Sequence, residues 1–140
     1  MSTHAYNIWT DGGARGNPGP AAYGFVIKGL GTDAVRQGEA IGRATNNVAE
    51  YTGVVEALRA LARHISADEA LVARVTVYAD SELLVKQMNG IYRVKDARLR
   101  ELHADVRNEA QKFGAVLFVH VRRGENKEAD RLVNMALDRD

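Results

Sequence analysis

Hydrophobic and polar positions change their period along the chain, and the changes predict both strands and helices. Up to residue 43 apolar and polar residues alternate as in strands, over 5–11, 21–28 and 36–43, with glycine-rich turns between these segments. Three strands joined by short turns favour an antiparallel meander. From residue 47 to about residue 64 the apolar positions recur at helical spacing instead.

The second half of the chain alternates strands with helices. The apolar run 71–80 predicts a strand buried on both faces, and 81–90 predicts a short helix with Ser81 as N-cap and Gly90 as its stop. A helix is predicted over 97–114, a last strand over 115–122, and a C-terminal helix over 125–140 with Asn126 as its N-cap. This order predicts one α/β domain over residues 1–140, with a mixed sheet and helices on its faces.

Composition narrows the chemistry by exclusion. The 140 residues include no cysteine, which excludes disulfides and thiolate metal sites and leaves oxygen and imidazole ligands. No apolar run approaches the ~18 residues of a membrane span, and residues 1–7 lack the basic and apolar regions of a signal peptide. We therefore expect a cytoplasmic protein without a membrane partner. The net charge of +1 indicates no polyanionic partner by itself.

Four carboxylates occupy positions where a charge is costly. Asp11 and Asp80 end predicted strands, where functional groups collect in open sheets, and Glu50 and Asp130 lie along the apolar stripes of their helices. Taken singly, each has an ordinary interpretation as a turn former, a cap or a partner of the helix dipole. If the four converge, their repulsion calls for a divalent cation, and oxygen ligands favour Mg²⁺ or Mn²⁺. Spacing alone does not show that they converge.

A resemblance to type 1 ribonuclease H is carried, in order, by the blocks TDGGARGNPGPAAYG, TNNVAEYTGVVEAL, VYADSELLVKQMNG and ENKEADRLVN. The blocks cover nearly the whole chain. The resemblance implies a ribonuclease H-like α/β fold: a five-stranded mixed sheet, with an antiparallel meander of three strands plus parallel strands, flanked by helices. It also implies an endonuclease that hydrolyses the RNA strand of RNA–DNA hybrids and leaves 5′-phosphate and 3′-hydroxyl ends.

The same resemblance implies roles for individual residues. Metal binding and catalysis would fall to Asp11, Glu50, Asp80 and Asp130. They would hold two Mg²⁺ ions, with Mn²⁺ as a substitute, roughly 3.5–4 Å apart at the scissile phosphate. Contacts with nucleic acid would fall to Gly12, Gly16, Asn17, Thr45, Asn46 and Asn47.

These contacts would differ in kind. Glycines without side chains would let the backbone approach the minor groove, where the asparagines would meet the 2′-hydroxyls that mark RNA. Thr45 would touch a DNA phosphate. Taken alone, the glycine-rich segment would be a turn, and Asn46 or Asn47 would be the N-cap of the helix that follows.

The sequence departs from the family pattern in two places. The loop before Asp130 is shorter than in many members and holds no histidine, so Arg122, Arg123 or Glu125 would take over part of that role. His120 lies on the predicted strand, and we interpret it as structural. The basic helix and loop with which some members grip the hybrid is absent, so we expect weak and strongly salt-dependent binding of the hybrid. A similar short loop occurs in an archaeal-like subgroup, some of whose members cut double-stranded RNA, and this second activity stays open.

Two rival functions are less favoured. A nuclease of the same fold that acts on DNA, such as a strand transferase or junction resolvase, would gain nothing from readers of 2′-hydroxyls. A non-catalytic hybrid-binding module would not need all four acids. We expect a monomeric enzyme whose partner is the RNA–DNA hybrid.

Overall fold

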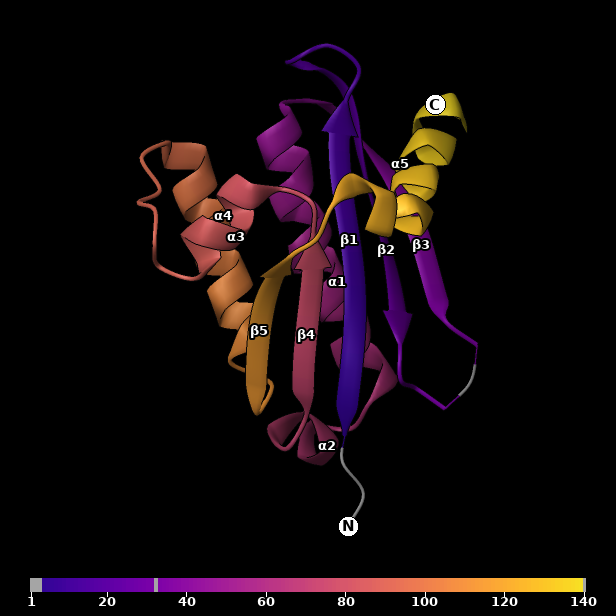
Figure 1. Ribbon diagram of the computed structural model, residues 1–140, viewed down its shortest axis with the longest axis vertical. Coiled ribbons are helices and arrows are strands. Elements are labelled where there is room, and N and C mark those ends of the chain that lie inside the picture. The colour runs from indigo at the N-terminus through magenta and orange to yellow at the C-terminus, as the bar shows by residue number, and fades with distance from the viewer. Residues whose placement is uncertain (1–3, 32, 140) are drawn as a thin grey trace.

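Five strands form one mixed sheet in the computed structural model, which describes residues 4–31 and 33–139. The strand order is β3-β2-β1-β4-β5 (Figure 1). The strands are β1 (Ala5–Ala14), β2 (Gly19–Lys28), β3 (Val35–Ala44), β4 (Arg74–Ala79) and β5 (Ala115–His120). The first three pair antiparallel, whereas β4 lies parallel to both β1 and β5. The predicted α/β fold, a meander of three strands extended by parallel strands, is confirmed.

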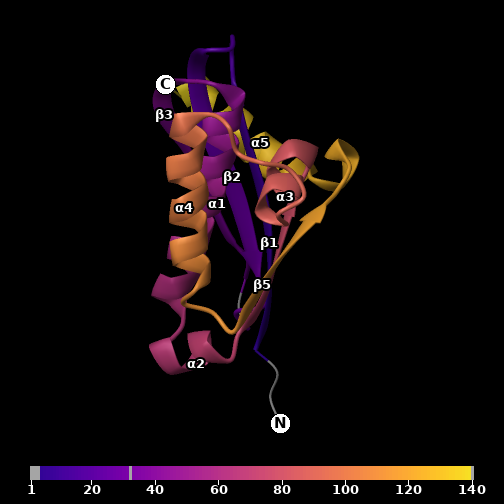
Figure 2. The same cartoon turned by 90° about the vertical axis from the view of Figure 1, so that its left-hand side faces the viewer.

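Helices cover the two faces of the sheet unequally. They are α1 (Asn46–His64), α2 (Ala67–Leu71), α3 (Glu82–Met88), α4 (Ala97–Ala110) and α5 (Lys127–Arg139), with a 3₁₀ turn η1 (Arg123–Glu125). Figure 2 shows α1 and α4 on one side of the sheet and α5 on the other. The α5 helix packs mainly on β2 and β3. Within residues 4–31 and 33–139, no helix is long and apolar enough to cross a membrane.

The core lies between the sheet and α1, as the helical spacing predicts. Ile8 and Phe25 of the sheet are fully buried, and so are Val54, Leu58 and Leu61 of α1. No helix is inserted between α3 and α4, which are joined by residues 89–96. The predicted absence of an extra basic helix is therefore confirmed for the described part of the chain.

Strand ends differ from the prediction. Asp11 does not end β1, because β1 continues to Ala14 and Asp11 pairs with Gly24 of β2. The prediction failed because the pairing depends on a tight turn, which residue spacing does not reveal. The strand expected over 71–80 is shorter, since the unpredicted α2 takes its first residue, and its burial alternates along β4. Burial on both faces was therefore a wrong prediction.

Helix caps were predicted with mixed success. Ser81 caps α3 as predicted, since its hydroxyl accepts the N–H of Leu84 at 3.2 Å. The α1 cap is Thr45, whose hydroxyl accepts the N–H of Val48, so the alternative caps Asn46 and Asn47 were wrong. A β-region residue directly before the first helical turn is the one placed to reach that N–H.

Candidate active site

The four carboxylates of the sequence prediction line one cleft of about 510 Å³. Asp11 lies on β1, and Asp80 directly follows β4. The two residues lie at the same level of the sheet, because β1 and β4 are parallel neighbours. Glu50 comes from the first turns of α1, and Asp130 comes from the first turn of α5. Four elements that are distant in sequence therefore bring their acidic side chains to one place.

The cleft is electrostatically strained without a cation. Burial, assisted by repulsion from Asp80 and Asp130, raises the pKa of Asp11 to about 8. Burial and repulsion from Asp80 also raise the pKa of Glu50 to about 7, although Arg123 opposes this rise. The protein thus supplies too little positive charge to stabilise the ionised forms of these carboxyls.

A divalent cation with oxygen ligands fits this donor set. Carboxylates are the ligands that hard cations such as Mg²⁺ prefer, and a cation would relieve the repulsion between them. Among the described residues, no three acidic or histidine side chains already stand as ligands of a single ion. Binding would therefore require the carboxylates to draw together around the ion.

The three residues proposed to replace the missing loop histidine have different surroundings in the structure. Arg123 lines the cleft with the carboxylates. Arg122 and Glu125 form a hydrogen bond with each other instead, since the backbone N–H of Arg122 donates to Glu125 Oε1 at 3.2 Å. Glu125 lines a different cavity, of about 260 Å³. Of the three, only Arg123 is placed to act in the cleft.

His120 lies at the exposed end of β5. Its Nε2 is 3.3 Å from the carbonyl oxygen of Asp80. The contact is with the backbone and not with a carboxylate, which fits the interpretation of His120 as structural.

The predicted nucleic-acid contacts form a braced turn beside the cleft. The N–H of Asn46 donates to Asn17 Oδ1 at 3.1 Å, and Asn46 Oδ1 accepts the N–H of Ala14 at 2.7 Å. Gly16 has a φ of 95°, a conformation that favours glycine, and so allows the chain to turn between β1 and β2. Two asparagines therefore fix this turn against the start of α1.

Gly12 serves a purpose that the sequence did not reveal. A Cβ atom at this position would lie 2.4 Å from the backbone carbon of Ala49 and 2.4 Å from the nitrogen of Glu50. The missing side chain allows α1 to pack against β1. The expectation that it also lets nucleic acid approach stays a prediction.

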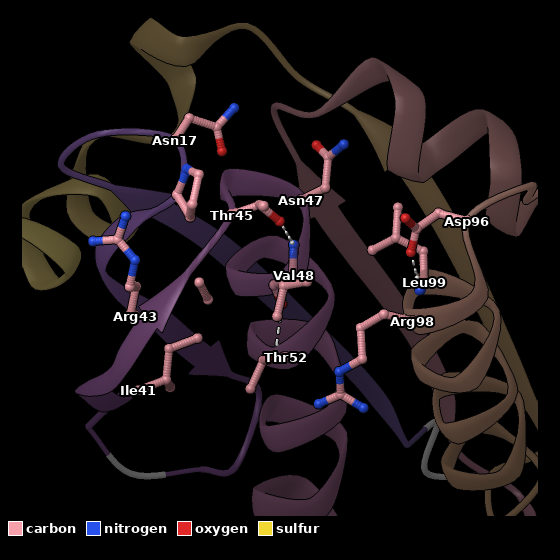
Figure 3. Close-up of a pocket in the computed structure, with 12 residues that line it drawn as sticks. Asn17, Ile41, Arg43, Thr45, Asn47, Val48, Thr52, Asp96, Arg98 and Leu99 are labelled. Atoms are coloured by element: carbon pink, nitrogen blue, oxygen red, sulfur yellow. Dashed lines mark hydrogen bonds between the residues drawn. The ribbon is translucent and has the colours of Figure 1, made fainter.

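A second cavity of about 680 Å³ adjoins the cleft (Figure 3). Asn47 lines both cavities, so the two meet at this residue. Figure 3 shows Arg43 and Arg98 on opposite sides of the cavity, with Asn17 and Asn47 at one end. The lining includes Asn17, Arg43, Thr45, Asn47, Asp96 and Arg98. Sequence reasoning missed Arg43 and Arg98 as members of this site because they come from different elements, β3 and α4.

Comparison with known proteins identifies relatives of the chain. Residues 9–136 match the reverse transcriptase-like family. A bifunctional protein of Mycobacterium tuberculosis is 42% identical over 133 residues, which cover 94% of this chain and 35% of that protein. The ribonuclease HI of Halobacterium salinarum is 40% identical over 136 residues, covering 96% of this chain and 64% of that protein. The chain thus spans about a third to two thirds of the length of these relatives.

Two solved structures share the fold over their whole length. The RNase H1 of Halobacterium salinarum superimposes with a TM-score of 0.87 at 36% identity, covering 97% of this chain and 99% of that one. LC11-RNase H1, isolated from compost and solved in complex with an RNA/DNA hybrid, gives a TM-score of 0.88 at 41% identity, covering 96% and 97%.

Proposed function

Since the chain belongs to the type 1 ribonuclease H family, we propose that it hydrolyses the RNA strand of RNA–DNA hybrids. The observation that carries the proposal is the cleft in which Asp11, Glu50, Asp80 and Asp130 meet. The RNA/DNA hybrid bound by LC11-RNase H1 supports the choice of substrate. We further propose that the protein acts as a monomer in the cytoplasm.

The family depends on divalent metal ions, and we propose that the ions here are Mg²⁺, with Mn²⁺ as a substitute. Asp11, Glu50, Asp80 and Asp130 would hold them. When bound, the ions would supply Lewis acidity and positive charge at the scissile phosphate. Because the pKa values of the Asp11 and Glu50 carboxyls are raised, these groups hold protons that must leave before the carboxylates can serve as ligands. Arg123 adds a fixed positive charge beside them.

The bond changes of the reaction determine its products. A water oxygen adds to the phosphorus as the bond from phosphorus to the 3′ oxygen breaks. That water gives up a proton to solvent, and the leaving 3′ oxygen takes up a proton from solvent. The products are a 5′-phosphate and a 3′-hydroxyl. The protein's own contribution is to position the phosphate and balance its charge.

The second cavity supports a role in holding the uncut strand. Arg43 and Arg98 offer positive charge for phosphates on both of its sides. Asn17 and Asn47 lie together at one end of this cavity, and Asn47 also lines the cleft, so both amides would face the minor groove. Because the N–H of Asn46 holds the side chain of Asn17, the Asn17 amide would meet the hybrid in a fixed arrangement.

The deciding experiment compares three labelled duplexes: an RNA–DNA hybrid, the matching RNA–RNA duplex and the matching DNA–DNA duplex. Each is incubated with the protein in Mg²⁺, in Mn²⁺ and in EDTA. We expect metal-dependent cutting of the hybrid's RNA strand with 5′-phosphate ends, and the RNA–RNA lane reports whether that duplex is a second substrate. An Asp80→Asn variant should bind the hybrid without cutting it.

Other outcomes would select a rival. Cutting of the DNA–DNA duplex alone would favour a nuclease that acts on DNA. Absence of cutting by folded protein in either metal, with the hybrid still bound, would favour a binding module.

A further inference from the structure

Asn126 is a buried amide at the junction between η1 and α5, and the roles above do not use it. The residue is 1% exposed. Its Nδ2 donates to the carbonyl oxygen of Thr10 at 2.8 Å, and Thr10 is itself buried in β1. Figure 1 shows the connection from β5 to α5 crossing in front of β4 and β1. The bond therefore ties this connection to the middle of the sheet.

The residue is bonded on both sides to neighbours of the candidate metal ligands. Its side chain holds the carbonyl of Thr10, and the next residue along β1 is Asp11. Its own carbonyl oxygen accepts the N–H of Asp130 at 3.1 Å. A single residue thus links the backbones that carry two of the four carboxylates.

The link acts against a repulsive force. Asp11 and Asp130 line the same cleft, and their like charges repel each other when both carboxyls are ionised. The α5 helix carries Asp130 and contacts β1, and Asn126 directly precedes this helix. A direct bond from Asn126 to β1 is well placed to resist this repulsion.

Stability alone does not account for an asparagine at this position. Its Oδ1 is buried and has no hydrogen-bond partner among the described residues. A buried oxygen without a partner destabilises the fold by an amount comparable to a lost hydrogen bond. Asn126 occupies the predicted N-cap position, because it directly precedes α5 and its carbonyl accepts the N–H of Asp130, but its side chain adds no capping bond. A leucine of similar size would avoid the cost, but it could not donate to Thr10.

We propose that Asn126 is a positioning residue that keeps the start of α5, and with it Asp130, close enough to β1 for Asp130 and Asp11 to draw together around the same divalent cations. The inference rests on the proposed function, because it assumes that the cleft binds such cations. Residues that orient metal ligands typically change metal affinity or activity by about 10- to 100-fold when they are replaced.

The test measures metal affinity without relying on cleavage. Thermal unfolding of wild type, Asn126→Leu and Asn126→Ala is followed in EDTA and in increasing Mn²⁺ or Mg²⁺, and the rise in Tm gives the dissociation constant. Gln87→Met is the matched control. Gln87 is also a buried amide, bonded to Tyr51 and to the carbonyl of Arg93, but it does not link β1 to α5.

We expect both Asn126 variants to bind the cations about 10- to 100-fold more weakly. Asn126→Leu should unfold in EDTA within a few degrees of wild type, because it removes the unpaired Oδ1 and the bond to Thr10 together. Gln87→Met should unfold earlier and keep wild-type metal affinity. If Asn126→Leu does not fold, Asn126→Ala supplies the comparison.

Three results would overturn the positioning role. These are wild-type metal affinity in the Asn126 variants, equal weakening in Gln87→Met, and absence of cation binding by wild type. If wild type binds the cations but does not cut the hybrid, the proposed function fails and the positioning role stands.

Discussion

One methyl group at position 12 should destabilise the protein and displace a candidate ligand. In Gly12→Ala, the new Cβ would lie 2.4 Å from the backbone of Ala49 and Glu50, whereas ordinary van der Waals contact begins at 3.4 Å. The contacted atoms are backbone atoms of a helix, so a side chain cannot rotate away to make room. The α1 helix has to retreat from β1 by about 1 Å, carrying Glu50 with it.

The cost follows from this displacement. Overpacking of a well-packed interior costs about 1–3 kcal/mol, and contact with rigid backbone places Gly12→Ala near the upper value. For a domain of this size, that loss lowers Tm by about 10 °C. A misplacement of about 1 Å in a catalytic group can reduce the rate by about 100-fold. Activity should therefore fall further than the unfolded fraction at the assay temperature explains.

Gly13→Ala is the matched control, because its new Cβ would find its nearest atoms at 3.9 Å. Unfolding in urea gives the free energy of each variant, and cleavage of the RNA–DNA hybrid gives the activity. If Gly12→Ala matches both wild type and Gly13→Ala in unfolding free energy within about 0.5 kcal/mol, the packing argument is wrong.

Two further predictions concern the charge of the cleft. Glu50→Gln should stabilise the metal-free protein at pH 8 by up to about 3 kcal/mol in urea unfolding, since the pKa of Glu50 rises from 4.5 to about 7, and the gain should vanish below pH 4.5. Raised carboxyl pKa values mean that the native state binds more protons than the unfolded chain, so the contribution of Asp11 and Glu50 to stability should fall between about pH 4 and pH 8. Mg²⁺ should reverse this loss of stability, so that the ion raises Tm more at pH 8 than at pH 5. An equal rise in Tm at the two pH values would contradict the assignment of these carboxylates as metal ligands.

The elements of the fold were predictable because local burial imposes their periods. Strand alternation in β1 and β2 and helical spacing in α1 each report which face meets the core. The five residues of α2 are too few to show a period, and its residues were assigned to other segments. The end of β1 was missed because Asp11 pairs with Gly24 across the sheet, a contact that is not local.

The candidate site was predictable in its residues and not in its geometry. A carboxylate on an apolar stripe, as at Glu50, is visible in a helical projection. Convergence depends on strand order, which places β4 beside β1 rather than beside β3. Gly12 is packed closely against α1, and Asn126 donates a hydrogen bond to Thr10. Neither contact leaves a signal in the residues next to it in sequence.

The order in which the chain is synthesised gives the position of Asp130 a further meaning. The helix that carries it, α5, is the last element of the fold, whereas Asp11 lies in the first. A growing chain can form the meander and pair β4 with β1 well before α5 leaves the ribosome. A nascent chain that lacks α5 would thus hold three of the four carboxylates and an incomplete cleft. The cleft is in this way completed only after α5 has been synthesised.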